Sequence, residues 1–267
     1  MNNSLLWKPK KIIRLYADKF RLRPSSRFSL IRQLYWQSLA KHRKQGKQVI
    51  HFLHQRKTGG TALKHALADH RATESHIIEY HQHDVTLDMI PVGDKFFFFV
   101  RDPITRFISG FNSRKRLGYP ASYRPWREKE KFVFTHFDTP NQLALSLSAT
   151  DSVVRSNAEK AMKSIDHIKY SHWDCFHDEA YFRSRFEDIL FIGFQEQFSD
   201  DVKILGKLLG LGGQISLPSD PDIANRSPIR IGSQLDEQAY KNLQSWYARD
   251  IYFIELCREI RKLKKWT

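Results

Sequence analysis

The feature that most constrains the fold is an apolar segment followed at once by a glycine-rich turn. Residues 48–53 read QVIHFL, which is typical of a buried strand, and residues 54–63 read HQRKTGGTAL. The paired glycines allow a tight turn, and the residues after them predict a short helix over 61–70. A strand, a glycine-rich turn and a helix form the context in which main-chain N–H groups bind phosphate. The common nucleotide loop places its lysine after the glycines, whereas Lys57 precedes them here.

Strand and helix patterns alternate along the chain, which predicts right-handed βαβ units and a parallel sheet. The run FFFFV at 96–100 is apolar enough for a central strand covered on both faces. Residues 112–137 are polar, basic and aromatic, with Gly118, Pro120 and Pro125, so we expect a long loop there. The predicted fold class is α/β, with a P-loop-like central parallel sheet flanked by helices. Strands are expected at 48–53, 76–80, 95–100 and 188–193, and helices from Pro103, from Thr139-Pro140, from Asp151 to about 165, at 196–209, and from a capping box at Ser233 and Asp236 to about 263.

Positive charge is concentrated at the N-terminus and predicts an anionic partner. The formal net charge is +15, and residues 1–47 hold 13 lysines and arginines against one acid, Asp18. We divide the chain into a basic helical N-terminal segment, 1–47, and a domain over 48–267. The N-terminal segment either packs on the domain as two helices or binds an anionic membrane surface.

Composition excludes several classes of protein. Aromatic residues make up 13% of the chain, which argues against disorder. The two cysteines, Cys175 and Cys257, cannot build a disulfide framework. No apolar run approaches the roughly 20 residues that span a bilayer, and early lysines interrupt any signal peptide. We therefore expect a cytoplasmic protein, with peripheral membrane association as an alternative.

A second basic motif follows the predicted central strand. Residues 97–111 read FFFVRDPITRFISGF, which places Arg101 at the end of the strand, where ligands bind in open α/β sheets. Arg101 can bind a phosphate bidentately, and Ser109 lies about two helical turns further on, on a similar face to Thr105. Two anion sites on neighbouring strands indicate a ligand with phosphates at two ends.

Together, KTGGTAL and VRDPITRFISGF resemble the paired motifs of the PAPS-dependent sulfotransferases over roughly residues 48–260. The resemblance is to the carbohydrate branch, which includes the heparan sulfate and uronyl 2-O-sulfotransferases and bacterial relatives. It implies sulfuryl transfer from PAPS (3′-phosphoadenosine 5′-phosphosulfate) to a carbohydrate hydroxyl, yielding PAP without a metal. Carried over by position, the 5′-phosphosulfate loop is Arg56, Lys57, Thr58, Gly59, Gly60, Thr61 and Ala62, and the 3′-phosphate clamp is Arg101 and Ser109.

A His-x-His pair stands between the two motifs, in EYHQH at 79–83. The resemblance implies catalytic roles for His81 and His83. Because imidazole titrates near neutrality, we expect His83 to act as general base on the acceptor hydroxyl, with His81 assisting or orienting the acceptor. Lys57 is expected to stabilise charge on the leaving phosphate oxygen.

Other matches to this family are weaker. Asn225-Arg226-Ser227 resembles a C-terminal segment that closes over the nucleotide, so Arg226 and Ser227 are candidates for the 3′-phosphate. Arg56 departs from the family, which usually has proline before the loop lysine. The Golgi members' N-terminal membrane anchor has no counterpart in this sequence, which favours a bacterial-type cytoplasmic enzyme.

The predicted loop over 112–137 is the candidate acceptor-binding region. Aromatic faces suit sugar rings and arginines suit carboxylates or sulfates; the alternative is a solvated loop. The candidates are Arg114, Arg116, Tyr123 and Trp126. We expect no nucleic-acid partner and no metal, because the spacing of His167, His172, Cys175 and His177 fits no standard zinc site.

Two other functions are weighed against the sulfotransferase. A P-loop-type kinase needs Gly-Lys-Ser/Thr, but the Gly-Lys pairs at 46–47 and 206–207 are followed by Gln48 and Leu208. A non-catalytic module that binds polyanions or membrane surfaces is suggested by residues 1–47. It predicts binding that persists without PAPS and is lost when residues 1–47 are deleted.

Overall fold

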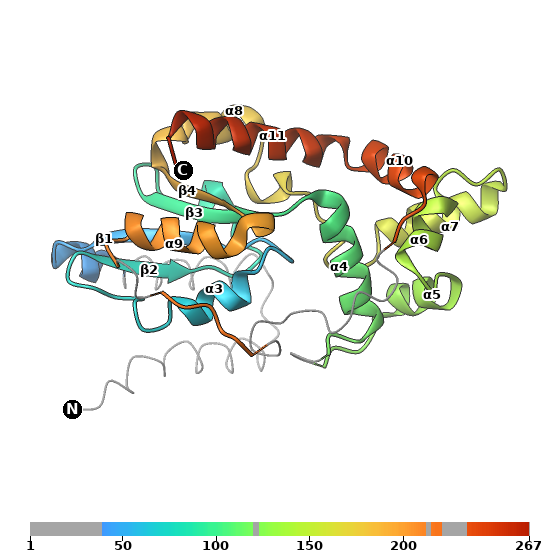
Figure 1. The fold of residues 1–267 in the computed structure, drawn as a ribbon, viewed down its shortest axis with the longest axis horizontal. Helices are drawn as coiled ribbons and strands as arrows, with labels where there is room; N and C mark the ends of the chain where they lie inside the picture. The colour runs from blue at the N-terminus through green and yellow to red at the C-terminus, as the bar shows by residue number, and fades with distance from the viewer. Residues whose placement is uncertain (1–38, 120–122, 212–214, 221–233, 267) are drawn as a thin grey trace. The chain divides into compact units, whose positions relative to one another are not determined.

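A computed structural model describes residues 39–119, 123–211, 215–220 and 234–266 (Figure 1). The chain divides into two units, Met1–Val49 and Ile50–Thr267. Most of the predicted N-terminal helical segment and Ser233 of the predicted capping box lie outside the described residues. The elements are β1 (Gln48–Leu53), α3 (Gly60–Ala66), β2 (His76–Tyr80), β3 (Lys95–Val100), α4 (Pro103–Lys115), α5 (Glu128–His136), α6 (Pro140–Ser146), α7 (Ser152–Met162), α8 (Glu179–Ser184), β4 (Ile189–Phe194), α9 (Phe198–Leu208), α10 (Glu237–Trp246) and α11 (Ala248–Leu263).

The four strands form one sheet in the order β2-β1-β3-β4. β3 pairs in parallel with β1 on one side and with β4 on the other, so it is internal as the run FFFFV predicts. Phe96 to Phe99 are completely buried, and α9 and α11 both contact β4 (Figure 1). The predicted α/β class with a parallel, helix-flanked sheet is confirmed.

The register of the sheet brings the two predicted phosphate motifs to the same edge. Leu53, the last residue of β1, is aligned with Phe98 of β3. Because the strands are parallel, the turn after β1 and Arg101 after β3 emerge at the same edge of the sheet. The pairing of β1 with β3 therefore places the glycine-rich turn and Arg101 at the same end of the sheet.

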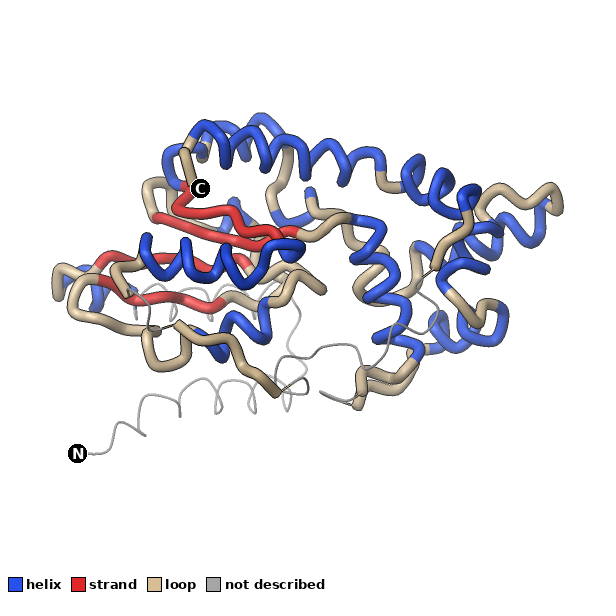
Figure 2. Tube along the Cα trace, viewed as in Figure 1, coloured by secondary structure: helices blue, strands red, loops and turns tan. Residues whose placement is uncertain are grey.

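A second group of helices packs without strands (Figure 2). In this group α6 contacts α4, α7 and α10, and α5 contacts α7. Their apolar faces enclose a separate core that includes Phe107, Phe111, Phe134, Leu143 and Leu243. Helix α4 belongs to this group and starts beside the sheet at Pro103, so it connects the site to the second core.

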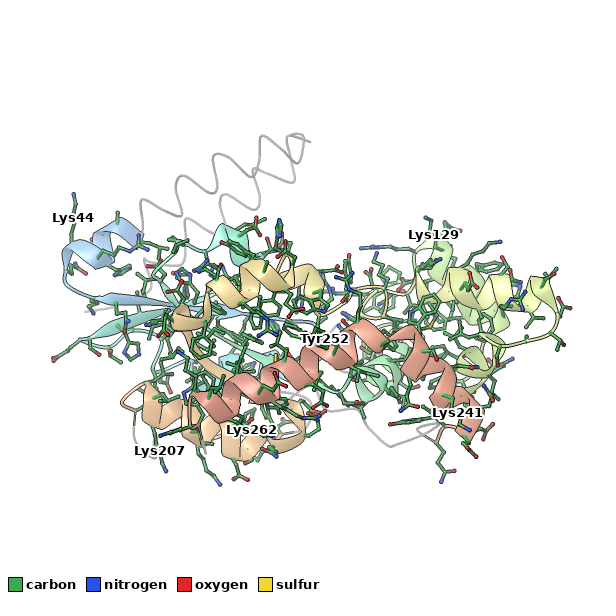
Figure 3. The ribbon with its side chains drawn as sticks, turned by 90° about the horizontal axis from the view of Figure 1, so that it is seen from above. Lys44, Lys129, Lys207, Lys241, Tyr252 and Lys262 are labelled. Atoms are coloured by element: carbon green, nitrogen blue, oxygen red, sulfur yellow. The ribbon has the colours of Figure 1, made fainter. Side chains whose placement is uncertain are left out.

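Two sequence predictions about helices were wrong. Residues 112–137 are not one long loop, because α4 continues to Lys115 and α5 spans Glu128–His136. The charged start of α5 is stabilised by Glu130, which accepts from the Arg127 N–H, while Val133 and Phe134 are buried. The predicted C-terminal helix is broken at Tyr247 into α10 and α11; Figure 3 labels Lys241 on the former and Tyr252 and Lys262 on the latter.

The helices predicted from Thr139-Pro140 and from Asp151 are confirmed, with Thr139 and Asp151 as their N-caps. The Thr139 side chain accepts from the Gln142 N–H, and Asp151 accepts from Val153 and Val154. Within the described residues, no helix is long and apolar enough to cross a membrane.

Candidate active site

The turn between β1 and α3 has the backbone of an anion-binding loop. Lys57 and Gly59 both adopt left-handed conformations, with φ of 63° and 84°. Alternation of left- and right-handed residues makes successive N–H groups converge into a concave nest that binds anions. No side chain caps the start of α3 at Gly59, so the first N–H groups of that turn are not consumed by a cap.

Both glycines of the loop are required by close neighbours. A Cβ on Gly60 would lie 2.0 Å from the His54 ring, and one on Gly59 would lie 2.7 Å from the Phe198 ring. Gly59 also has a positive φ, which side chains rarely adopt. The pair Gly-Gly is therefore explained by the packing of the His54 and Phe198 rings against it.

The loop threonines differ in their surroundings. Thr58 is completely buried, and its hydroxyl donates to the Gln55 carbonyl at 3.1 Å, so the side chain braces the turn. Thr61 is half-buried in the first turn of α3, and Ala62 is buried beside it. Of the two loop threonines, Thr61 is thus the one that remains partly accessible.

Positive charges converge on Lys57. Burial, followed by the charges of Arg101 and Arg116, lowers the pKa of Lys57 to about 8. Arg101 also donates from Nη1 to the Lys57 carbonyl at 3.4 Å. Cations held this close in a partly buried site repel one another, and a bound anion would offset that repulsion. This cluster of cations could bind a multiply charged anion.

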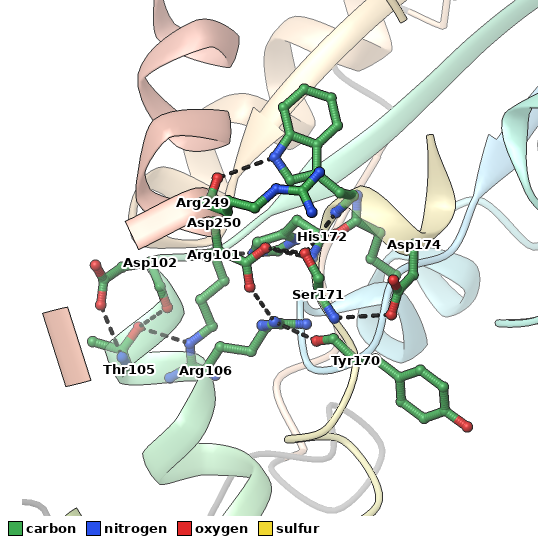
Figure 4. Close-up of polar contacts among 12 residues, drawn as sticks. Arg101, Asp102, Thr105, Arg106, Tyr170, Ser171, His172, Asp174, Arg249 and Asp250 are labelled. Carbon is green, nitrogen blue, oxygen red and sulfur yellow. Dashed lines mark hydrogen bonds and ion pairs between the residues drawn. The ribbon is translucent and has the colours of Figure 1, made fainter. Parts of the chain in front are cut away.

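Arg101 is oriented by α4 (Figure 4). Its Nε donates to the Thr105 hydroxyl at 3.1 Å, and Asp102 caps the helix by accepting from the Thr105 N–H at 2.8 Å. Glu196, after β4, accepts from the Asp102 N–H at 2.8 Å. Ser109 is half-buried on the same helix, two turns beyond Arg101. Arg101 thus lies just before α4 and Ser109 lies within it.

A buried histidine joins the two phosphate motifs. His172 Nε2 donates to the Arg101 carbonyl at 2.9 Å, and its Nδ1 contacts the Gln55 side chain. Asp250 of α11 fixes this segment by accepting from the His172 N–H at 2.8 Å and from Arg106 at 3.0 Å (Figure 4). Sequence patterns do not predict this role, because the contacts join residues far apart in the chain.

His83 is fixed beside the loop. Its Nδ1 donates to the His54 carbonyl at 2.7 Å, and its own carbonyl accepts from Arg56 at 3.1 Å. With Nδ1 protonated in the neutral ring, Nε2 carries the lone pair and is the basic atom. Burial lowers the pKa of His83 to about 4, despite the opposing effect of the hydrogen bond that the ring donates to the His54 carbonyl, so the ring is neutral at pH 7.

A cavity of about 240 Å³ lies next to His83. Arg56 lines it with its guanidinium 3.9 Å from the centre of the Tyr170 ring, in a cation–π contact. The other lining residues are His54, Gln55, Asp84, Thr86, Arg106, Ser171, Asp174 and Cys175.

His81 is placed differently from His83. It is buried, and its Nε2 lies 2.9 Å from Nδ1 of His51, whose Nε2 in turn contacts Asp94 at 3.0 Å. The His81 carbonyl accepts from Lys64 at 3.2 Å. The ring is thus engaged within the sheet, and of the His-x-His pair the structure brings His83 to the loop.

The predicted acceptor residues fall into two groups. Arg114 is buried in a bidentate ion pair with Glu130, with both distances 2.8 Å, and Trp126 donates to the Arg114 carbonyl and packs on Phe134. Both have structural partners. Arg116 lies near enough to Lys57 to lower its pKa. Tyr123 is exposed and its ring centre lies 5.6 Å from that of Tyr119.

Arg226 and Ser227 lie outside the described residues, so their predicted contact with the 3′-phosphate stays a prediction. Among the residues that are described, no group of three His, Cys, Asp or Glu side chains is arranged to hold a metal ion.

Comparisons with known proteins give the family. Neither the curated proteins nor the solved structures that were compared with the chain include a match. A model of the sulfotransferase family matches residues 43–254, which include the glycine-rich loop, His83 and Arg101. The chain therefore belongs to the sulfotransferase family and is a sulfotransferase, for which the family implies PAPS as co-substrate.

Proposed function

We propose that this enzyme transfers the sulfuryl group of PAPS to a hydroxyl of a carbohydrate, in a polysaccharide or glycoconjugate, and releases PAP. The observation that carries the proposal is the convergence of Lys57 and Arg101 on the loop beside a neutral His83. A doubly phosphorylated donor would offset the charges of Lys57 and Arg101, and His83 would serve as the base for the acceptor hydroxyl.

The donor is proposed to lie across the ends of β1 and β3. The main-chain N–H groups of residues 58–62, with Lys57 and the Thr61 hydroxyl, hold the 5′-phosphosulfate. Arg101 and Ser109 hold the 3′-phosphate, assisted by Arg226 and Ser227. In this placement the phosphate loop and the clamp are fixed to each other through His172.

The reaction is proposed to be an in-line displacement at sulfur. The acceptor oxygen forms a bond to sulfur as the bond from sulfur to the 5′-phosphate oxygen breaks. The acceptor proton passes to His83 Nε2, and Lys57 stabilises the charge that develops on the leaving oxygen. His81 is proposed to support the position of His83 from within the sheet.

A carbohydrate acceptor is supported by the exposed aromatic pair of Tyr119 and Tyr123 and by Arg116 near Lys57. Aromatic faces stack on sugar rings, and a guanidinium pairs with sugar carboxylates or sulfates. We further propose that residues 1–47 bring the enzyme to an anionic membrane surface in the cytoplasm.

The test is sulfate transfer from ³⁵S-labelled PAPS to a panel of neutral and anionic glycans. Transfer to a glycan hydroxyl, with PAP as the second product, is the expected result. Transfer only to phenols or amines would refute the carbohydrate acceptor while leaving sulfuryl transfer intact. If residues 1–47 only direct the enzyme to a membrane, their deletion should leave transfer to soluble neutral acceptors unchanged. Loss of that activity would contradict this role.

A further inference from the structure

The cavity next to His83 leads from the surface into the interior of the domain. Asp84 and Asp174 line it and are exposed, whereas Gln55 and Arg106 line it and are buried. Its volume of about 240 Å³ lies just below the roughly 300–1,000 Å³ of typical small-molecule sites. A cavity of this size admits one sugar ring rather than an extended chain.

The two arginines in the wall of this cavity are engaged with other parts of the wall. Arg106 pairs with Asp250 at 3.0 Å and donates to the Tyr170 carbonyl at 2.7 Å (Figure 4). Arg56 donates to the His83 carbonyl at 3.1 Å, and its guanidinium lies 3.9 Å from the centre of the Tyr170 ring. Both guanidinium groups therefore help to build the cavity.

The exposed carboxylates at the cavity give it negative charge. Asp174 accepts from one main-chain N–H at 3.0 Å, and a carboxylate has about four acceptor positions, so others remain for a ligand. Because Asp250 balances the charge of Arg106, Asp84 and Asp174 together outweigh the single charge of Arg56. Carboxylates accept strong hydrogen bonds from hydroxyl groups and repel other anions.

The inner wall of the cavity contains buried polar atoms that lack partners. Gln55 is 6% exposed, and within the described part of the chain its Nε2 has no hydrogen-bond partner. The same holds for Nδ1 of His54, which also lines the cavity. Buried polar groups in folded proteins nearly always have partners. Two exceptions in the wall of one cavity indicate that a polar ligand completes it.

We propose that this cavity holds the ring of the acceptor that becomes sulfated, and that this ring is an uncharged sugar whose hydroxyl groups bind Asp84 and Asp174. The inference rests on the proposed function. His83 lines the same cavity, so a hydroxyl of the bound ring meets the proposed base. A uronate or a sulfated ring is disfavoured because its charge would face the two carboxylates. Charged rings elsewhere in a polymer can pair with Arg116.

The test uses pairs of neutral and uronate polymers as acceptors of ³⁵S from labelled PAPS: galactan with polygalacturonate, mannan with polymannuronate, and glucan with polyglucuronate. The parent protein should have the higher kcat/KM with a neutral polymer. Asp84→Asn should raise the KM for that polymer about 10-fold, as expected for the loss of a charge-assisted hydrogen bond, while the Kd for PAP stays within threefold. Asp174→Asn, which keeps an oxygen for the main-chain N–H, should act in the same way.

Reversal of the charge at the cavity gives a second measurement. Asp84→Lys should lower the preference for the neutral over the uronate polymer at least about 10-fold. The matched control is Glu237→Lys, which makes the same change in net charge at an exposed residue of α10 that pairs with Lys241 at 2.6 Å. It should leave the preference and the PAP affinity as in the parent.

Three results would overturn the inference: a parent that prefers the uronate polymers, an unchanged KM for the neutral polymer in the Asp84 and Asp174 variants, or equal shifts in Asp84→Lys and Glu237→Lys. Failure of the proposed function would look different. If the parent bound PAP but labelled no glycan, the carbohydrate acceptor would be rejected, and the role of the cavity with it. If glycans were labelled without any response to the changes at Asp84 and Asp174, the role of the cavity alone would be rejected.

Discussion

Arg56 donates to the main-chain carbonyl of His83 at 3.1 Å, while His83 Nδ1 donates to the carbonyl of His54 at 2.7 Å. These two bonds tie the phosphate loop to the segment that carries the proposed base. Arg56 stands where the resemblance to carbohydrate sulfotransferases leads one to expect proline, which has no side-chain donor. We therefore interpret Arg56 as a residue that positions His83.

Replacement of Arg56 by alanine should slow turnover more than it weakens donor binding. Without the guanidinium, the His83 segment loses its tie to the loop, and misplacement of a base by about 1 Å can cost roughly 100-fold in rate. We expect kcat to fall roughly 10- to 100-fold with the Kd for PAP changed less than threefold. Arg56→Lys, which keeps a donor, should recover part of the rate.

The control for Arg56 is Arg183→Ala, which removes an exposed arginine paired with Glu179 on α8. It should leave both constants unchanged. Equal losses of kcat and PAP affinity in Arg56→Ala would show that Arg56 contacts the donor directly and would contradict the positioning role.

The pH dependence of kcat/KM should be bell-shaped, because it reports the ionisable groups of the free enzyme. Burial lowers the pKa of His83 to about 4 and that of Lys57 to about 8. The base must be neutral and the lysine charged, so activity should rise as pH increases through about 4 and fall as pH increases through about 8. An acidic limb centred at or above the ordinary histidine pKa of about 6.5 would contradict the burial of His83.

Much of the fold follows from local patterns in the sequence. The apolar runs of β1, β3 and β4 and the helix starts at Thr139-Pro140 and Asp151 are short-range signals, and each was predicted. Helix α5 was missed because its first turn is charged and Glu130 in that turn pairs with Arg114, which lies on another helix. The break at Tyr247 was missed because helical periodicity continues on both sides of it.

The site divides in the same way. Lys57 and the glycines directly follow one predicted strand, and Arg101 directly follows another. Their place at one edge of the sheet could therefore be predicted from the sequence. Gln55, His172 and Asp250 meet only through tertiary contacts, and no local spacing indicates that they interact. The predicted acceptor residue Arg114 carries the right charge, but its ion pair with Glu130 depends on a helix that the sequence did not reveal.

Replacement of Gly60 by alanine should damage both stability and donor binding. The new methyl group would meet the His54 ring at 2.0 Å, so the loop or the ring must move. We expect a loss of about 1–3 kcal/mol in the free energy of unfolding, measured by urea denaturation, and weaker PAP binding. Gly93→Ala is the comparison, because Gly93 has a φ of 91° and open space around it. It should lose stability through backbone strain while retaining PAP affinity, and unchanged PAP binding in Gly60→Ala would contradict the loop assignment.

Arg101→Ala should weaken recognition of the 3′-phosphate selectively. A charge-assisted bidentate contact is lost, which corresponds to roughly 10- to 100-fold in affinity. Calorimetric titration should show this loss for PAP but little change for adenosine 5′-phosphosulfate, which lacks the 3′-phosphate. Lys203→Ala, an exposed change on α9, is the control. Equal losses of affinity for the two nucleotides would contradict the contact of Arg101 with the 3′-phosphate and would place Arg101 at the 5′ end of the donor.

The most direct test of the account compares the parent enzyme with His83→Ala and Lys57→Ala in one assay of ³⁵S transfer from PAPS, with PAP affinity measured in parallel. We expect the parent to label a glycan acceptor. Both variants should lose at least about 100-fold in rate, and His83→Ala should bind PAP as tightly as the parent. Near-normal transfer by His83→Ala, or no PAP binding by the parent, would contradict the central claim.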